Sequence, residues 1–146
     1  MDATSASGLV DALTERTSTD LERSDKRRFY EQIVQKLEPG LRTVYLSTQG
    51  RNNNTLADGR WTAGLLLSDF PTVAHMVKAS GGAVWSPNFN DVSAEAVKGA
   101  QALGLKVIPW TVNEMEDLKL VIEAGVDGLI TDYPDRGRAA LPKSVT

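Results

Sequence analysis

The residues best suited to chemistry stand at the ends of three short apolar segments. Trp85 and Asn88 stand at the end of one segment, Trp110 and Asn113 at the end of the next, and Asp132 after the third. If these segments are parallel β-strands, their carboxyl ends gather on one side of the sheet, where such proteins carry their sites. An indole or an amide there can contact a small polar substrate, and a carboxylate can hold a metal ion.

Each aromatic or amide residue also has a purely structural explanation. Trp110 and Trp85 can fill the core, since inward side chains of barrel strands pack in layers. Asn113, with Glu116 three residues later, fits a helix N-cap with a capping-box partner, and we favour that explanation over substrate contact. For Asn88 a turn role is favoured.

The charged residues near the C-terminus are explained in the same two ways. Asp132 and Asp135 are a carboxylate pair that could suggest a metal site, but turn and capping roles explain them better. Arg136 and Arg138 could reach a phosphate, although short charged runs are more often solvated. His75 is the single histidine of the chain, and its helical position predicts that it faces solvent.

Helices and strands alternate along the predicted chain. Glycines that suit helix ends stand at Gly82, Gly104 and Gly125, each followed by an apolar strand. Such alternation is typical of a parallel sheet covered by helices, either a barrel or an open sheet. The pattern predicts helices over 25–37, 69–80, 93–103 and 113–124, strands over 41–47, 61–67, 83–86, 105–112 and 128–131, and a solvated loop over 48–60.

Two runs of residues resemble the glycerophosphodiester phosphodiesterase family. They are WTVN at 110–113 and GLITDYP at 128–134, with weaker similarity over 41–47, 61–67 and 77–89. The resemblance implies an α/β fold, the C-terminal portion of a (β/α)8 TIM barrel with four to five strand–helix units and open strand edges. A full barrel takes about 250 residues. We therefore expect a weakly matched helical segment over 1–40 and the barrel portion over 41–146.

The resemblance also implies an activity and the residues it requires. The family hydrolyses glycerophosphodiesters to glycerol 3-phosphate and an alcohol with a divalent cation, Mg or Ca. Its His-Arg, Glu-x-Asp and Glu-x-Lys runs are absent here, because His75 precedes Met76 and every Glu lacks Asp or Lys two residues later. The segment at 20–25 (DLERSD) is charged where relatives carry an apolar strand. The chain alone is therefore predicted to be inactive.

For this chain the resemblance implies only substrate-binding residues, which are Trp110, Asn113 and Trp85. It implies no catalytic residue and no metal ligand in the chain, and no cofactor bound by the chain alone. The expected ligand is a glycerophosphodiester, bound once a missing half completes the barrel.

A partial barrel leaves unpaired strand edges and an apolar inner face that something should cover. The candidates are a second copy, a separately encoded N-terminal half, or the N-terminal helices. Two alternatives to a split enzyme therefore stay open: a non-enzymatic half-barrel that binds or assembles as a homodimer, and a gene fragment.

Composition limits the kinds of molecule that the chain is expected to bind. The chain has 146 residues, 41% hydrophobic and 24% charged, with a net charge of −3 and a pI near 5.2, which is ordinary for a globular domain. An acidic balance argues against nucleic acid or an anionic membrane surface. Without cysteine, a signal peptide or an apolar run of spanning length, we expect a soluble chain of unknown compartment.

Overall fold

The computed structural model of the chain describes residues 34–62 and 64–142. Three of the predicted features lie wholly or largely outside these residues: the segment 1–40, the helix over 25–37 and the DLERSD segment at 20–25. Helical residues at 34–37 are the described end of that helix, and they stop before Pro39.

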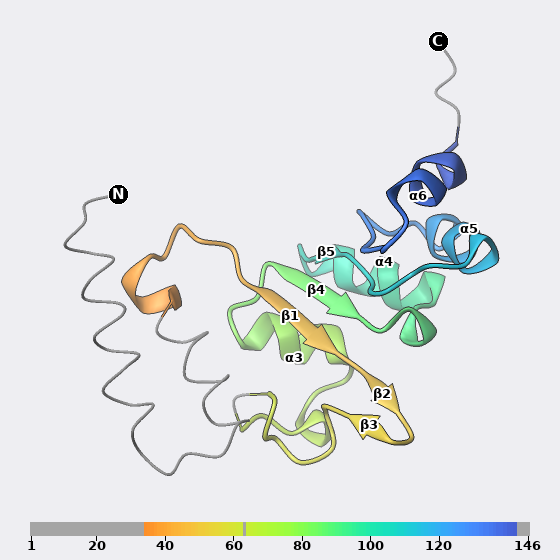
Figure 1. Cartoon of the computed structure of the whole chain (residues 1–146). Coiled ribbons are helices and arrows are strands. Elements are labelled where there is room, and N and C mark those ends of the chain that lie inside the picture. Colours follow the sequence, from red (N-terminus) through yellow and green to blue (C-terminus); the bar gives the residue numbers. More distant parts are fainter. Residues whose placement is uncertain (1–33, 63, 143–146) are drawn as a thin grey trace, which may run out of the picture.

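A parallel sheet forms the centre of the described chain, and its strands follow one another in sequence order (Figure 1). The strands are β1 (Val44–Ser47), β4 (Val84–Pro87) and β5 (Lys106–Val107), in the order β1-β4-β5. The register places Tyr45 beside Trp85, and Trp85 beside Val107. This arrangement is the parallel sheet that the alternating pattern predicts.

Backbone hydrogen bonds extend the sheet by one more segment. Val112 N donates to Ile130 O at 2.8 Å, and Ile130 N donates to Pro109 O at 2.9 Å. Residues 127–131 therefore lie beside 107–112, as the predicted strands over 105–112 and 128–131 require. The result is an arc of four neighbouring segments, which agrees with the lower end of the predicted four to five units.

Short helices connect the strands and cover the sheet, and capping side chains stabilise the first turns of two of them. Thr72 accepts from His75 N and Ser93 accepts from Ala96 N, so each satisfies an amide of a first turn. The helices are α3 (Val73–Ala79), α4 (Ala94–Ala102), α5 (Met115–Glu123) and α6 (Pro134–Ala140), with 3-10 turns η1 (Leu67–Asp69) and η2 (Phe89–Asp91). None of the helices in the described part of the chain has the length and apolarity needed to span a bilayer.

The core lies between the sheet and the helices. Its larger cluster joins Trp85 and Val107 of the sheet to helical residues such as Val77, Val97 and Ala100. A smaller cluster packs Val112 against helix α5. Because side chains alternate along a strand, the neighbours of Tyr45 point to the other face of the sheet. There Val44 is 40% exposed and Leu46 is 50% exposed, so the inner face of the arc is open.

Asp127 joins three parts of this framework at the end of the sheet opposite the polar tips. Its carboxylate accepts from Lys106 Nζ at 2.7 Å, from Val107 N at 2.9 Å and from Gln101 Nε2 at 3.1 Å. Partial burial raises the pKa of this carboxyl, but the three hydrogen bonds and the positive charge of Lys106 outweigh it. The pKa of Asp127 is therefore lowered from its ordinary value.

The predicted strand over 61–67 is wrong. Gly59 and Gly64 have φ of +76° and +78°, a conformation that permits sharp turns. The amides are satisfied locally, since Gly64 N donates to Gly59 O at 2.9 Å and Leu65 N donates to Thr62 O at 3.1 Å. Apolar composition alone suggested a strand, whereas the two glycines fold the segment into turns ahead of η1.

The other loop and glycine predictions need smaller changes. The loop over 48–60 is largely exposed, as predicted, but contains a hairpin of β2 (Gln49–Gly50) and β3 (Asn53–Asn54). Gly104 and Gly125 follow α4 and α5 at positive φ, as predicted for glycines at helix ends. After α3 the glycine at positive φ is Gly81, whereas Gly82 was predicted. At Gly82 a Cβ would lie 2.7 Å from Val77 Cγ1, so close packing accounts for this second glycine.

Candidate functional site

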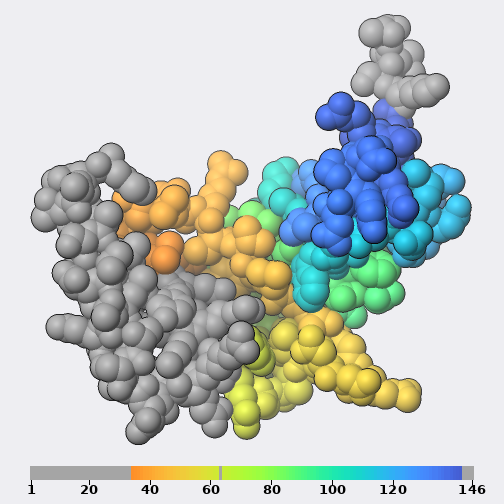
Figure 2. All heavy atoms as spheres, in the orientation of Figure 1, coloured from red at the N-terminus to blue at the C-terminus, as the bar shows by residue number. Residues whose placement is uncertain are grey.

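A pocket of about 410 Å³ opens where the strands end and the hairpin begins. Trp110, Trp61 and Leu46 provide apolar surface, and Asn53 and Thr55 provide polar groups. In Figure 2 the hairpin atoms, in yellow, project from the body of the chain. The lining carries no charged side chain, so this wall can stack on or hydrogen-bond to a ligand but cannot neutralise a phosphate.

Trp110 is held firmly as a wall of this pocket. Its Nε1 donates to Ser86 O at 2.8 Å, and its backbone N donates to Pro87 O at 3.0 Å. Its own carbonyl accepts from Phe89 N at 3.0 Å. The indole is half-buried, so one part packs in the sheet while the rest meets the pocket. These bonds give the ring a fixed orientation before any ligand arrives.

Trp85 lies on the helix side of the sheet, in the larger core cluster, with 4% of its surface exposed. Its Nε1 donates to Ser47 Oγ at 2.9 Å. This is the core-packing role given above as the structural alternative to substrate contact. The indole thereby fixes the end of β1, next to the pocket residue Thr48.

The predicted helix cap at Asn113 is wrong. Glu114 takes the N-cap position of α5, without a side-chain capping bond. Asn113 instead joins two loops: its Nδ2 donates to Asp132 Oδ2 at 2.8 Å, and its Oδ1 accepts from Asp132 N at 3.0 Å and Thr131 Oγ1 at 3.2 Å. Because neighbouring parallel strands end side by side, their loops meet, and an amide can both donate and accept there.

Arg136 completes this junction. Its Nη1 donates to Asn113 O at 3.0 Å and lies 3.7 Å from Glu114 Oε1, and its guanidinium stacks 4.1 Å from the Tyr133 ring centre. The guanidinium is therefore occupied by the protein itself. Arg138 is exposed in the last turn of α6.

The remaining candidates have structural roles. Asn88 Oδ1 accepts from Asn90 N at 3.0 Å, which confirms the predicted turn. Asp135 is exposed in the first turn of α6, where a carboxylate suits the helix start. His75 is exposed, as predicted, and its Nδ1 lies 2.9 Å from Thr72 Oγ1.

The described residues do not fit the divalent cation that the family resemblance implies. Across residues 34–62 and 64–142, no group of three or more His, Cys, Asp or Glu side chains is arranged to hold a metal ion. The acidic groups nearest the junction already have partners, since Asp132 accepts from Asn113 and Glu114 faces Arg136. No metal ligand is therefore assigned.

Sequence reasoning missed the contribution of the hairpin and the turns after it. Trp61, Asn53 and Thr55 line the pocket, although their segment was predicted to be a solvated loop and a strand. Asp91 Oδ2 accepts from Gln49 N at 2.9 Å and thereby fastens the hairpin to η2. The available signal was Trp61, a few residues after the polar run NNNT at 52–55.

Comparison with known proteins identifies the family of this chain. The Glycerophosphoryl diester phosphodiesterase family matches residues 16–136. A glycerophosphodiester phosphodiesterase of Caldanaerobacter subterraneus subsp. tengcongensis is 45% identical over 49 residues, which is 34% of this chain and 20% of that protein. The matched part is therefore a small portion of that relative's length.

Solved structures of similar fold support the same family assignment. A structure from Silicibacter pomeroyi DSS-3, described as a glycerophosphoryl diester phosphodiesterase, is 33% identical with a TM-score of 0.64, covering 77% of this chain and 35% of that one. A phosphodiesterase of Oleispira antarctica, solved with sn-glycerol-3-phosphate, has a TM-score of 0.55 at 18% identity and covers 77% of this chain and 38% of that one, which shows the fold alone. These likenesses confirm the predicted portion of a (β/α)8 barrel.

Proposed function

Because the chain belongs to the glycerophosphoryl diester phosphodiesterase family, we propose that it forms one wall of a glycerophosphodiester-binding pocket. The observation that carries the proposal is the 410 Å³ pocket beside the fixed indole of Trp110, at the carboxyl ends of the strands. The indole packs against the carbon chain of the glycerol or alcohol moiety. Thr48, Asn53 and Thr55 offer hydrogen bonds to its hydroxyl groups.

The other two predicted contacts have different parts in this proposal. Asn113 uses one Nδ2 hydrogen for Asp132, and an amide has a second hydrogen that can donate to a substrate oxygen. Trp85 acts from behind the sheet, since its bond to Ser47 holds the strand end that leads into the pocket. It is thus proposed as a positioning residue.

Hydrolysis, in this proposal, requires groups that the described residues do not provide. The family reaction depends on a divalent cation and on acid–base residues, and no cluster of metal ligands forms within residues 34–62 and 64–142. General acid–base catalysis alone contributes about 10²- to 10⁴-fold in rate. We therefore propose that the chain by itself binds weakly and does not turn over substrate, and that an N-terminal half-barrel completes the enzyme.

The test combines turnover with binding. The purified chain is assayed with glycerophosphocholine in Mg²⁺ or Ca²⁺, and binding of the same compound is followed by calorimetry for the wild type, Trp110→Ala and Trp110→Phe. We expect no turnover and weak binding that Trp110→Ala loses and Trp110→Phe keeps. Circular dichroism checks that each variant is folded.

Two results would contradict the proposal in different ways. Robust turnover that a chelator abolishes would overturn the predicted inactivity. Binding that is equally strong in Trp110→Ala and the wild type would overturn the assigned pocket.

A second candidate function is a non-enzymatic assembly module, favoured by the open inner face of the arc. Val44 is 40%, Leu46 50% and Ile130 44% exposed, and β1 is the last strand on its side of the described sheet. Unpaired parallel edges and apolar faces favour association. Light scattering after size exclusion distinguishes the two: a dimer that Leu46→Lys converts to monomer supports assembly, and a wild-type monomer argues against it.

A further inference from the structure

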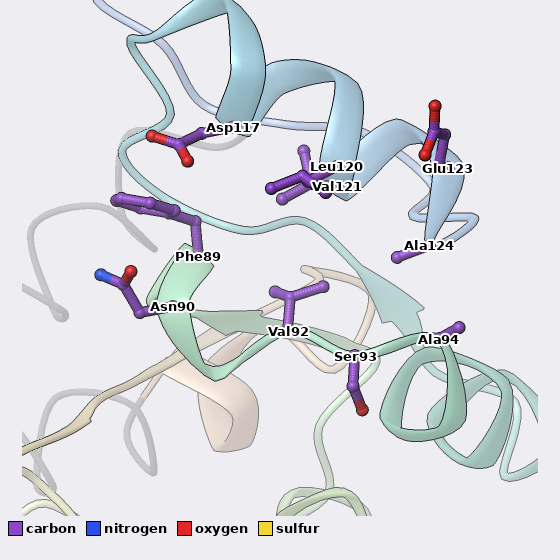
Figure 3. A pocket seen from close by; sticks show the side chains of 10 residues that line it. All are labelled: Phe89, Asn90, Val92, Ser93, Ala94, Asp117, Leu120, Val121, Glu123 and Ala124. Carbon is purple, nitrogen blue, oxygen red and sulfur yellow. The ribbon is translucent and has the colours of Figure 1, made fainter.

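A second groove, of about 480 Å³, lies on the helical side of the described chain and apart from the proposed pocket. Helix α5 forms one wall and the stretch from Phe89 to Ala94 forms the other (Figure 3). The groove shares no lining residue with the pocket beside Trp110. An inference drawn from it therefore goes beyond the proposed function.

The middle of the groove is apolar and partly unfilled. Figure 3 shows Leu120 and Val121 projecting from α5 toward Val92 on the opposite wall. Val121 is 3% exposed and belongs to the core, whereas Leu120 is 62% exposed. A leucine that stays this exposed beside buried neighbours offers a contact surface rather than a packed one.

The ends of the groove are acidic. Asp117 lies at one end, close to Phe89, and Glu123 lies at the other end near Ala124 (Figure 3). Neither carboxylate has an ion-pair partner among the described residues, and the lining contains no Lys, Arg or His. The two acids are six positions apart on one helix, so they are separated by about 9 Å along its axis.

We propose that this groove docks an amphipathic helix of a partner protein, with an aliphatic stripe between two basic side chains. The aliphatic side chains fill the space around Leu120 and Val92, and the basic ones face Asp117 and Glu123. A helix laid along α5 satisfies this pattern when its Lys or Arg residues are six or seven positions apart, because its rise then matches the separation of the acids. Charge complementarity disfavours an anionic membrane surface as the occupant.

The test measures binding of a designed, fluorescently labelled helical peptide to the full chain by anisotropy. One face of the peptide carries two leucines flanked by lysines, and a second peptide replaces the lysines with glutamates. We expect the basic peptide to bind, its affinity to fall with added salt, and the acidic peptide not to bind. Leu120→Ser should weaken binding by about tenfold or more, since it removes the apolar contact without changing the charge of the groove.

Charge-reversal variants distinguish binding in the groove from non-specific attraction of the basic peptide to an acidic protein. Glu123→Lys should weaken binding of the basic peptide, whereas Glu116→Lys should leave it within about twofold, because Glu116 is on α5 but does not line the groove. Both positions are exposed, and circular dichroism checks that the variants fold.

Four outcomes would overturn the proposal. These are absence of binding by the basic peptide, equal binding of both peptides, equal effects of the two charge reversals, and dissociation of a wild-type dimer by Leu120→Ser. The last result would show that a second copy occupies the groove. None of them depends on pocket binding, so failure here is distinguishable from failure of the proposed function.

Discussion

Removing the Asp127 side chain should destabilise the chain much more than neutralising it. The carboxylate accepts from Val107 N at 2.9 Å, and Val107 is fully buried, so its amide depends on this acceptor. Asp127→Ala leaves that buried donor unsatisfied and also removes the bonds from Lys106 and Gln101. Asp127→Asn retains an oxygen that can still accept from Val107.

The expected magnitudes follow from the three contacts. A buried amide that loses its acceptor costs about 1–3 kcal/mol. The Lys106 partner is 63% exposed at its side chain, so that ion pair contributes only about 0–1 kcal/mol. Asp127→Ala should therefore lower the free energy of unfolding by about 2–3 kcal/mol, and Asp127→Asn by about 1 kcal/mol.

Urea unfolding at neutral pH, followed by tryptophan fluorescence, measures both values. Lys106→Met is the control, because it removes the exposed ion pair and leaves the Val107 bond in place. The reasoning is refuted if Asp127→Ala and Asp127→Asn are equally destabilised, or if Lys106→Met costs as much as Asp127→Ala.

Three further predictions concern Asp127, Gly82 and Asn113. The lowered pKa of Asp127 stabilises the fold above the ordinary aspartate pKa of about 3.9, so the stability advantage of the wild type over Asp127→Asn should disappear as urea midpoints are measured at falling pH. Gly82→Ala should cost about 1–3 kcal/mol in the same unfolding assay because its Cβ would lie 2.9 Å from Val77 O, whereas Gly99→Ala, with nothing within 4 Å, should gain up to about 1 kcal/mol. Asn113→Ala should speed hydrogen exchange at Asp132 N, whose acceptor it removes; unchanged exchange would contradict the loop junction.

Much of the fold could be predicted because its signals are local. Ser93 before an amphipathic segment and glycines at the ends of α4 and α5 mark boundaries that the structure keeps. The turns at 59–66 could not be predicted, since their glycines are interspersed with apolar residues of strand-like composition. At 81–82 the sequence offers two adjacent glycines, and which one turns depends on contact with Val77.

The candidate site was less predictable because its contacts join distant segments. Asn113 has a suitable cap sequence, but its side chain bonds to Asp132 and Thr131 in the next loop. Trp61 enters the pocket because the hairpin and turns bring it beside Trp110. Neither contact has a local signature, so sequence reasoning located the edge of the sheet and two of its tryptophans but not the partners of Asn113.

The agreement between chain order and strand order has a consequence for how this arc assembles. Neighbouring strands are separated by about 20 to 40 residues along the chain, as Val84 is from Val44 and from Lys106. Loop-closure entropy rises only slowly with length, so the difference between these connections changes the cost of pairing little. Units can therefore be added one after another as the ribosome releases them, and a recombination break between two units would preserve every pairing on either side of the cut.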